Sequence, residues 1–468
     1  MTEQTSPILS IEFIIVGGGI AGLSAACALS KVGHKVTVLD QGDDFLNTEY
    51  GGGCRLAPNM TKKFYEWGLE EELRKYSIVG QYLTLARYET GEVASSGEWG
   101  EKFELDRAGE YIQLRFSALR RLLYEAALRF GATVRPNSVV KTLHPEPNRP
   151  SVILESGEEL SADVLVGADG NHSISRQTML GCKEALIRKS MVMYDATIPR
   201  DKMAADPDLD ALLTNNQYGK LMLWHGDGRG ASGYEITKNA YCMQVYAPGS
   251  SEMPFPVSVL SSEELVEVLG ECDLRLRKLA ALANNVLAIP VIRQPQLTDW
   301  VHPNGKFIAI GEAAHPLITG TVYTAGLAAE DGIMLGKMFS YLRYYNQITP
   351  FLSAVEDVRQ KRVADALEAQ SVNPTDASMP AGIDAQESLK VMESIADGTL
   401  SLDEVNDLLH QALGVIFAYD PEEEAEHWWV HWGLLRERAG SGTPVIFDPI
   451  TVLQEQENEF EQAFTDAV

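Results

Sequence analysis

The start of the chain alternates apolar runs with short polar stretches, and this pattern predicts strands and helices in turn. Residues 11–16 form an apolar run of strand length that ends in three glycines, and residues 20–32 carry apolar side chains at helical spacing. Residues 35–40 form another run with the composition of a strand. A strand, a helix and a strand in this order predict a βαβ unit.

The rest of the chain is predicted to return to this first sheet, to build a second region of strands, and to end in helices. Further strands are predicted at residues 82–104, 133–140, 151–155, 164–166, 287–293 and 306–311, with strands and turns throughout 191–248. Further helices are predicted at residues 60–73, 117–130, 262–269 and onward, 325–342 and 353–371. Asn59 is the expected N-cap of the first of these helices, and Ser401 that of a helix in the acidic C-terminal part.

Length and composition narrow the class of protein. The chain has 468 residues, enough for two domains, and its formal net charge of −27 without clusters of Lys and Arg makes nucleic acid an unexpected partner. The five cysteines form no CxxC pair and have no histidine ligands nearby, so no disulfide framework and no metal site are expected. No stretch approaches the roughly 20 apolar residues that span a bilayer. We therefore expect a soluble, cytoplasmic protein, either a monomer or a homodimer.

The first candidate site is a glycine loop, Gly17-x-Gly19-x-x-Gly22, between the first strand and the first helix. Gly17 suits a tight turn, Gly19 lets the backbone approach a pyrophosphate, and Gly22 allows close packing of helix and strand. Asp40, at the end of the next strand, can accept hydrogen bonds from an adenosine ribose. FAD and NAD share this fingerprint, so the loop alone does not choose between them. The expected contacts are Gly17, Gly19, Ile20, Ala21, Gly22 and Asp40.

A second candidate site is the segment DVLVGADGNHSISR at residues 163–176, which has the pattern of a buried strand ending in a turn. In that turn Asp169 can accept hydrogen bonds, and Gly170 permits the backbone conformation. Ser173 can cap the following helix, and Arg176 offers a planar fork to a phosphate. An ordinary strand-to-helix turn is the alternative interpretation.

Four ordered segments together resemble one family. They are residues 51–59 (GGGCRLAPN), 114–119 (LRFSAL), 163–176 and 311–316 (GEAAHP). They resemble the motifs of the class A flavoprotein aromatic monooxygenases, the group of para-hydroxybenzoate and salicylate hydroxylases, and especially its fungal members. The resemblance extends from the glycine loop to about the end of the helix predicted at 353–371.

The resemblance implies that FAD is the cofactor and that NADPH or NADH is the electron donor. Glu312 stands where an aspartate of the family contacts the flavin ribityl chain, so the same contact is expected with a changed geometry. Thr319 replaces a proline of the loop that passes the flavin ring, and Val322 and Thr324 replace glycines. Backbone N–H groups at the start of the next helix can stabilise negative charge on the reduced ring. The further FAD contacts implied are Gly53, Arg55, Arg115, Asp169, Gly170, Arg176, Gly311, Glu312, Thr324 and Ala325.

The resemblance also implies the reaction. In this family NAD(P)H reduces the flavin, O2 adds to give a C4a-hydroperoxide, and the distal oxygen is transferred to an electron-rich aromatic ring. We expect hydroxylation of a phenolic, hydroxybenzoate-type substrate, with or without loss of CO2. A flavin oxidase or dehydrogenase acting on a non-aromatic secondary metabolite is the alternative, and a non-catalytic flavin sensor is a further one.

No sequence motif marks the catalytic residues, in contrast to the cofactor contacts. Arg229 can pair with a substrate carboxylate, and His225 or Tyr234 can relay a phenolic proton. Tyr323, at the tip of the flavin loop, can face the ring or the substrate. Trp224, Tyr241 and Gln244 lie on the same predicted strands, where ordinary core packing is the alternative. His315 is more typical of a structural residue than of a catalytic base.

The predicted fold class is α/β, with a Rossmann-like FAD-binding domain interleaved with a β-sheet substrate domain and followed by a helical C-terminal region. The FAD-binding domain is assigned to residues 1–80, 108–185 and 296–350. The substrate domain is assigned to residues 81–107 and 186–295, and the helical region to residues 351–468.

Overall fold

The structure, a computed structural model, describes most of the chain in two compact units, Met1–Glu422 and Glu423–Val468. The described residues are 9–43, 45–46, 52–98, 109–182, 188–214, 218–226, 228–249, 257–292, 294–317, 320–371, 414 and 417–433. Of the second unit they include the end of helix α14 (Pro421–Trp428) and a π-helical turn at Trp429–Gly433. The predicted N-cap Ser401 lies outside them. No helix in these ranges is long and apolar enough to cross a membrane.

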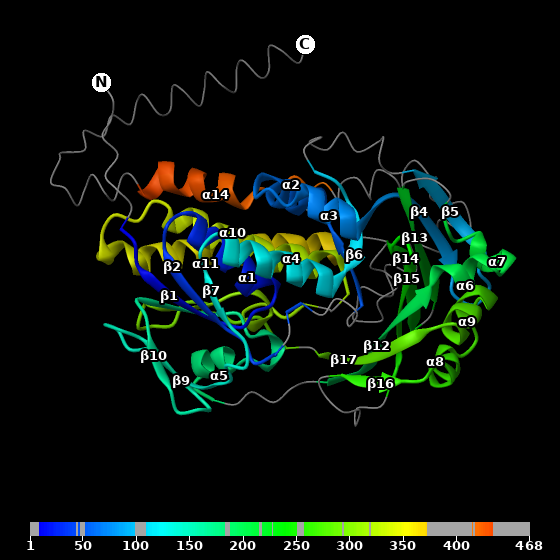
Figure 1. Cartoon of the computed structure of the whole chain (residues 1–468), viewed down its shortest axis with the longest axis horizontal. Helices are drawn as coiled ribbons and strands as arrows, with labels where there is room; N and C mark the ends of the chain where they lie inside the picture. The colour runs from blue at the N-terminus through cyan, green and yellow to red at the C-terminus, as the bar shows by residue number, and fades with distance from the viewer. Residues whose placement is uncertain are drawn as a thin grey trace, which may run out of the picture. The chain divides into compact units, whose positions relative to one another are not determined.

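A five-stranded parallel sheet confirms the predicted α/β class, and its strands follow the order β18-β11-β1-β2-β7. Figure 1 labels β1, β2 and β7 of this sheet. Helix α1 (Ile20–Lys31) connects β1 to β2, as the βαβ pattern predicted. A small antiparallel sheet packs on one face, where Ile14 and Val16 meet Leu143 and Val152 in one apolar cluster. The parallel strands are β1 (Glu12–Val16), β2 (Lys35–Leu39), β7 (Thr133–Arg135), β11 (Val164–Gly167) and β18 (Phe307–Ala309), and the small sheet is β8 (Val140–His144), β9 (Ser151–Leu154) and β10 (Glu159–Ser161).

Helices cover the other face of the parallel sheet, where α10 (Val322–Phe339) packs directly against α1 (Figure 1). The two helices approach closely because α10 presents glycines to α1. A Cβ atom on Gly332 or Gly336 would lie 2.3 Å from an atom of α1. The layer also contains α4 (Phe116–Arg129) and α11 (Ile348–Ser371). Close packing of α1 and α10 brings the two helix N-termini toward the same end of the sheet.

A ten-stranded sheet forms the second half of the same unit, in the order β16-β17-β12-β15-β14-β13-β4-β6-β3, with β5 paired to β4. One face packs on helices α8 (Ser262–Leu269) and α9 (Leu274–Ala281) through a large apolar cluster. The strands are β3 (Gly53–Leu56), β4 (Ser77–Arg87), β5 (Val93–Glu98), β6 (Ile112–Arg115), β12 (Arg188–Pro199), β13 (Tyr218–Gly226), β14 (Arg229–Thr237), β15 (Ala240–Pro248), β16 (Ser258–Leu260) and β17 (Asn284–Ile292). The opposite face of this ten-stranded sheet lines a pocket.

Three predicted elements extended too far, each past a backbone position with positive φ. The single helix at 60–73 is two helices, α2 (Pro58–Glu66) and α3 (Glu70–Tyr76), separated at Gly68 with φ 74°. Gly270, with φ 65°, likewise ends α8 before α9, and the strand predicted at 133–140 stops before Asn137, with φ 52°. Left-handed backbone cannot continue a helix or a strand.

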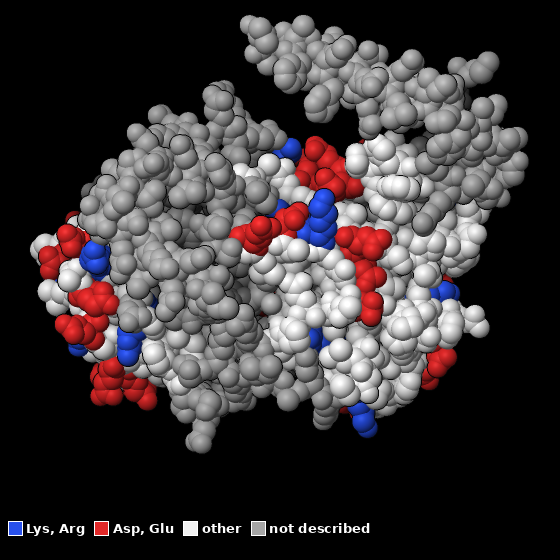
Figure 2. All heavy atoms as spheres, turned by 180° about the vertical axis from the view of Figure 1, so that it is seen from behind, with Lys and Arg blue, Asp and Glu red and all other residues white. Residues whose placement is uncertain are grey.

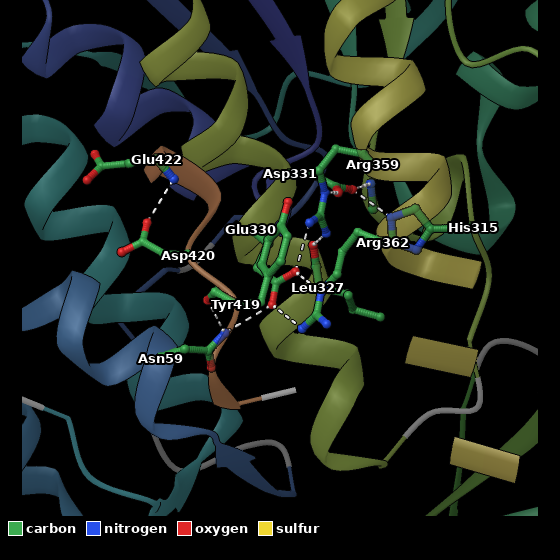
Figure 3. A network of polar contacts seen from close by, with 11 residues as sticks. Asn59, His315, Leu327, Glu330, Asp331, Arg359, Arg362, Tyr419, Asp420 and Glu422 are labelled. Atoms are coloured by element: carbon green, nitrogen blue, oxygen red, sulfur yellow. Dashed lines mark hydrogen bonds and ion pairs between the residues drawn. The ribbon is translucent and has the colours of Figure 1, made fainter. Parts of the chain in front are cut away.

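The predicted N-cap role of Asn59 was also wrong. Residue 57 is the N-cap of α2, and no side chain caps that end. Asn59 lies inside the helix, and its Nδ2 donates to Glu330 Oε1 at 3.2 Å and to the carbonyl oxygen of Tyr419 at 3.1 Å (Figure 3).

A buried ionic network joins α10 to α11 (Figure 3). Arg359 Nε lies 2.6 Å from Asp331 Oδ1, and its Nη1 lies 2.8 Å from Glu330 Oε2. Asp331 Oδ2 accepts from the backbone N–H of Gly311 at 2.7 Å and lies 2.6 Å from His315 Nε2. His315 also stacks on Trp300. His315 is therefore structural, and the network holds the turn that carries Glu312.

Candidate functional site

The glycine loop forms a cradle at the carboxyl end of β1. Gly17 has φ 106°, and a Cβ there would lie 2.3 Å from the carbonyl oxygen of Ala168 at the end of β11. A Cβ on Gly22 would lie 2.0 Å from the carbonyl oxygen of Gly17. Around Gly19, by contrast, a Cβ would meet no atom within 4 Å, and no side chain caps the N-terminus of α1. The loop therefore fits a pyrophosphate held by helix N–H groups.

Asp40 stands beside this loop, as predicted, and the structure adds a partner that the sequence pattern did not reveal. Its Oδ2 accepts from Gly18 N at 2.7 Å, and its Oδ1 accepts from Gly42 N at 2.8 Å. Arg120 lies 3.0 Å from the same Oδ1 and donates to the carbonyl oxygen of Gly18 at 2.8 Å. A carboxylate accepts about four hydrogen bonds, so Asp40 retains capacity for a ribose hydroxyl.

The 163–176 segment forms the predicted strand, turn and capped helix. Asp169 accepts from Ser173 Oγ at 2.5 Å and from Ser175 N at 3.1 Å. Ser173 caps α5 (Ile174–Leu180) by accepting from Arg176 N. The guanidinium of Arg176 is buried and donates to the carbonyl oxygens of residues 295 and 313. It lies outside the pocket lining, so this geometry gives no support to the predicted phosphate fork.

A pocket of about 320 Å³ joins the glycine loop to the free face of the ten-stranded sheet. Its volume lies within the range typical of small-molecule sites, and most of its lining is apolar. The first sheet and its connections contribute Gly19, Ile20, Ala21, Ala168, Gly170, Glu312, Gly320, Thr321, Thr324, Ala325 and Ala328. The second sheet and its edge contribute Gly52, Gly53, Cys54, Phe116, Met193, Asp195, Gln244, Leu287 and Ile289. The pocket thus brings together Gly19, Ile20, Ala21, Gly53, Gly170, Glu312, Thr324 and Ala325 of the predicted cofactor contacts.

Three other predicted contacts lie just behind the lining. Arg55 is buried and donates to the carbonyl oxygen of Gly320 at 2.7 Å, so it supports the loop before α10. Arg115 lies 3.5 Å from Thr197 Oγ1. Gly311, with φ 60°, faces Ala21, where a Cβ would lie 2.8 Å from the alanine Cβ. These residues shape the pocket, and their contact with a cofactor stays a prediction.

The N-terminus of α10 forms one wall of the pocket. Gly320 has φ 89°, and a Cβ there would lie 2.4 Å from the hydroxyl of Tyr246. Thr321 is the N-cap, and its Oγ1 lies 2.9 Å from Thr324 Oγ1. The positive end of an 18-residue helix therefore faces the pocket, where it favours negative charge. Thr319 lies outside the described residues.

The structure does not bring the four predicted catalytic residues to the pocket lining. Arg229 donates to the carbonyl oxygen of residue 268 at 2.5 Å, at the far end of a hairpin. Tyr234 is buried beneath Gly53, and Tyr323 is buried within α10. His225 on β13 lies opposite residue 230 on β14, which in turn lies opposite Tyr246 on β15. His225 is buried, and burial lowers its pKa to about 4.

The polar groups that do line the second sheet are Asp195 and Gln244. Gln244 Nε2 donates to Asp195 Oδ2 at 2.9 Å and to the carbonyl oxygen of Gly53 at 2.9 Å. Burial raises the pKa of Asp195 to about 6. The sequence prediction missed Asp195, although an aspartate within an otherwise apolar strand was a usable signal, since a buried carboxylate is rarely placed without a partner.

Comparisons with known proteins agree with this arrangement. Residues 10–233 match the family model described as FAD binding domain. The chain is 25% identical over 370 residues to the FAD-dependent monooxygenase OpS4 of Beauveria bassiana, covering 75% of this chain and 82% of that protein. It is 26% identical over 326 residues to the 3-hydroxybenzoate 6-hydroxylase of Klebsiella oxytoca, covering 69% and 78%.

A solved structure shares the fold. The structure of CtdE in complex with FAD and a substrate matches with a TM-score of 0.74 at 20% identity, over 92% of this chain and 100% of that one. The parallel sheet, its glycine loop and the pocket define a flavin-binding enzyme. Residues 10–233 belong to the FAD binding domain family, and the chain is similar to FAD-dependent monooxygenases, as the resemblance predicted.

Proposed function

We propose that the protein uses NADH or NADPH to reduce its FAD and then hydroxylates a phenolic aromatic substrate with O2. Bound FAD would supply the electron transfer and the activation of oxygen. The observation that carries the proposal is one pocket in which the glycine loop and the α10 N-terminus meet a largely apolar sheet face with a single buried carboxylate.

The residues of the first sheet suit the cofactor. The α1 N-terminus at Gly19 would hold the pyrophosphate, and Asp40 would bind the adenosine ribose. Glu312, which lines the pocket, would bind the ribityl chain. The α10 N-terminus near Thr324 would stabilise negative charge on the reduced ring.

The residues of the second sheet suit an aromatic substrate. Met193, Leu287 and Ile289 line this side of the pocket and offer apolar surface to a flat ring. Such surface also excludes water, which protects an oxygen-transfer reaction from side reactions. Polar recognition on this face comes from Asp195 and Gln244.

The test is a product screen with labelled O2 and a panel of phenols and phenolic acids. Purified protein should be yellow, NADH or NADPH should bleach it faster with a substrate present, and the product should contain one labelled oxygen. Among these substrates, hydroxybenzoate-type acids are expected from the sequence resemblance, and loss of CO2 would give a labelled phenol without the carboxyl group. Oxidation of a substrate without labelled oxygen in the product would favour the oxidase alternative and overturn the proposal.

A further inference from the structure

Asp195 is the only charged residue that the second sheet, the proposed substrate side, contributes to the described pocket lining. Side chains alternate along β12, so Tyr194 and Ala196 enter the apolar core beneath the sheet while Met193 and Asp195 face the pocket. The Asp195 side chain is buried, at 2% exposure. A carboxylate in this place can accept a hydrogen bond from a ligand bound in the pocket.

The protein satisfies this carboxylate only in part. Gln244 donates one hydrogen bond to Oδ2, the thiol of Cys242 lies 3.7 and 3.8 Å from the two oxygens, and the backbone N–H of Gly53 also acts on the carboxylate. Since a carboxylate accepts about four hydrogen bonds, capacity for a further donor is left. Among the described residues no ion pair reaches Asp195, whereas the buried Asp331 and Glu330 are both paired with arginines. A buried carboxylate without a cation is costly unless another donor satisfies it.

The surroundings disfavour a second anion. The described lining contains no Lys, Arg or His, and its two ionisable carboxyl groups are Asp195 and Glu312. A benzoate carboxylate placed against this sheet face would therefore meet like charge with no cation in the described lining to pair with it; Arg115, which acts on Asp195, lies outside that lining. A neutral phenol O–H or ring N–H would instead supply the missing donor.

We propose that Asp195 selects the substrate by accepting a hydrogen bond from a neutral donor on the aromatic ring, a phenol O–H or a ring N–H, and disfavours substrates that present a carboxylate there. This inference rests on the proposed function and narrows its substrate class. It makes Asp195 a specificity-determining residue of the site. This proposal for Asp195 replaces the role predicted for Arg229, which was to bind a substrate carboxylate.

Burial also raises the pKa of Glu312, on the first-sheet side of the pocket, while the groups beside Asp195 on the second sheet leave it as their titrating member near neutral pH. Burial raises the pKa of the thiols of Cys54 and Cys242 and of the hydroxyl of Tyr234, so all three are neutral below about pH 8. Arg115, on β6, lowers the pKa of Asp195 by its charge, but burial outweighs this effect. Leu287, opposite Asp195 on β17, is apolar.

The experiment measures binding, not turnover, with three probes of similar size. Methyl 3-hydroxybenzoate carries a neutral donor, 3-hydroxybenzoate adds a carboxylate, and methyl 3-methoxybenzoate lacks the donor. Dissociation constants come from perturbation of the flavin absorbance of the holoenzyme. At about pH 7.5 the phenolic ester should bind roughly tenfold tighter than either other probe, as expected for a charge-assisted hydrogen bond.

Two changes should abolish this preference. In Asp195→Asn the advantage of the phenolic ester should fall to about twofold or less, and in the wild type it should shrink as the pH falls through about 6, because protonation removes the charge. Glu235→Gln is the matched control, since Glu235 is a buried acid of the same sheet that pairs with Arg200 outside the pocket. It should leave the ratios unchanged.

The inference is overturned if 3-hydroxybenzoate binds the wild type as tightly as the phenolic ester near neutral pH, or if Asp195→Asn keeps the original ratios. The pH series on the wild type decides the matter even where the variant does not fold. The labelled-oxygen screen judges hydroxylation separately, so a failure there would overturn the proposed function while the binding ratios still decide the role of Asp195.

Discussion

Gly17 and Gly19 stand two residues apart in the same loop, and the structure requires glycine at each for a different reason. Gly17 combines a positive φ with a close approach to Ala168. Gly19 has extended backbone, with φ −82°, and open space where a side chain would be. The first glycine is needed for folding, and the second keeps space free for a ligand.

Alanine substitutions should separate these two roles. Gly17→Ala should lower the free energy of unfolding by roughly 3 kcal/mol, because it adds backbone strain and a clash. Gly19→Ala should unfold like the wild type and bind FAD at least tenfold more weakly, because its methyl group enters the cradle. Thermal unfolding of the apoprotein and FAD titration measure the two effects. Equal loss of stability in both variants would contradict this assignment.

Asp195 should reduce the stability of the apoprotein near neutral pH. Its folded pKa of about 6 lies above the ordinary value of 3.8, so the folded state holds the proton more tightly. That contribution to stability is complete below about pH 4 and is lost as the pH rises through 6. Asp195→Asn should therefore raise the melting temperature at about pH 7.5 and change it little near pH 4.5. A lower melting temperature at both pH values would show that the carboxylate is structurally required.

At the scale of elements, the α10–α11 contact depends on buried charges. Burial by itself would raise the pKa of Asp331, but His315 and Arg359 outweigh it and hold the pKa at about 2. The folded pKa lies below 3.8, so this stabilising contribution is present above about pH 4 and is lost as the pH falls through 2. The helix pair should therefore weaken in acid.

Arg359→Met should lower the free energy of unfolding by roughly 3 to 5 kcal/mol, because it leaves Asp331 and Glu330 buried without that partner. Urea unfolding at neutral pH measures the change. Arg135→Met is a suitable control, since the Arg135–Glu158 pair is short, at 2.6 Å, but both side chains are about one third or more exposed. Its loss should change the free energy of unfolding far less, because solvent screens an exposed pair. Similar losses in the two variants would argue against a special role for the buried network.

At the scale of the whole molecule, residues far apart in sequence build one site within the first unit. The pocket unites Gly19, Gly53, Gly170, Asp195 and Gly320, which come from both large sheets and their connections. Acidic side chains gather in several patches on the described part of the face shown in Figure 2. This distribution agrees with the net charge of −27 and with small molecules, rather than nucleic acid, as expected partners.

A ligand that contacts both sheets should stabilise the unit as a whole. FAD at about 100 times its dissociation constant should add about 2.7 kcal/mol to the free energy of unfolding. Riboflavin, which lacks the ADP part, should stabilise much less at the same concentration because it does not reach the glycine loop. Differential scanning fluorimetry of the apoprotein measures both. Equal stabilisation by the two ligands would contradict the assignment of the loop to the pyrophosphate.

The sequence by itself determined those features whose physical cause is local. A glycine at a tight turn, a serine that caps a helix, and a strand followed by an amphipathic helix each depend on residues within one or two turns of chain. The glycine loop, the Ser173 cap, the parallel sheet and the family were therefore predictable.

Only the tertiary structure decided which side chains face the pocket. That choice depends on strand order and register, which arise from pairing between distant segments. Register places Asp195 beside Gln244 and turns both toward Gly53, while Arg229 and Tyr234 lie outside the pocket lining. Asn59 likewise became a partner of Glu330, 271 residues away, instead of a helix cap. Long-range pairing, which no local pattern encodes, placed the substrate side of this site.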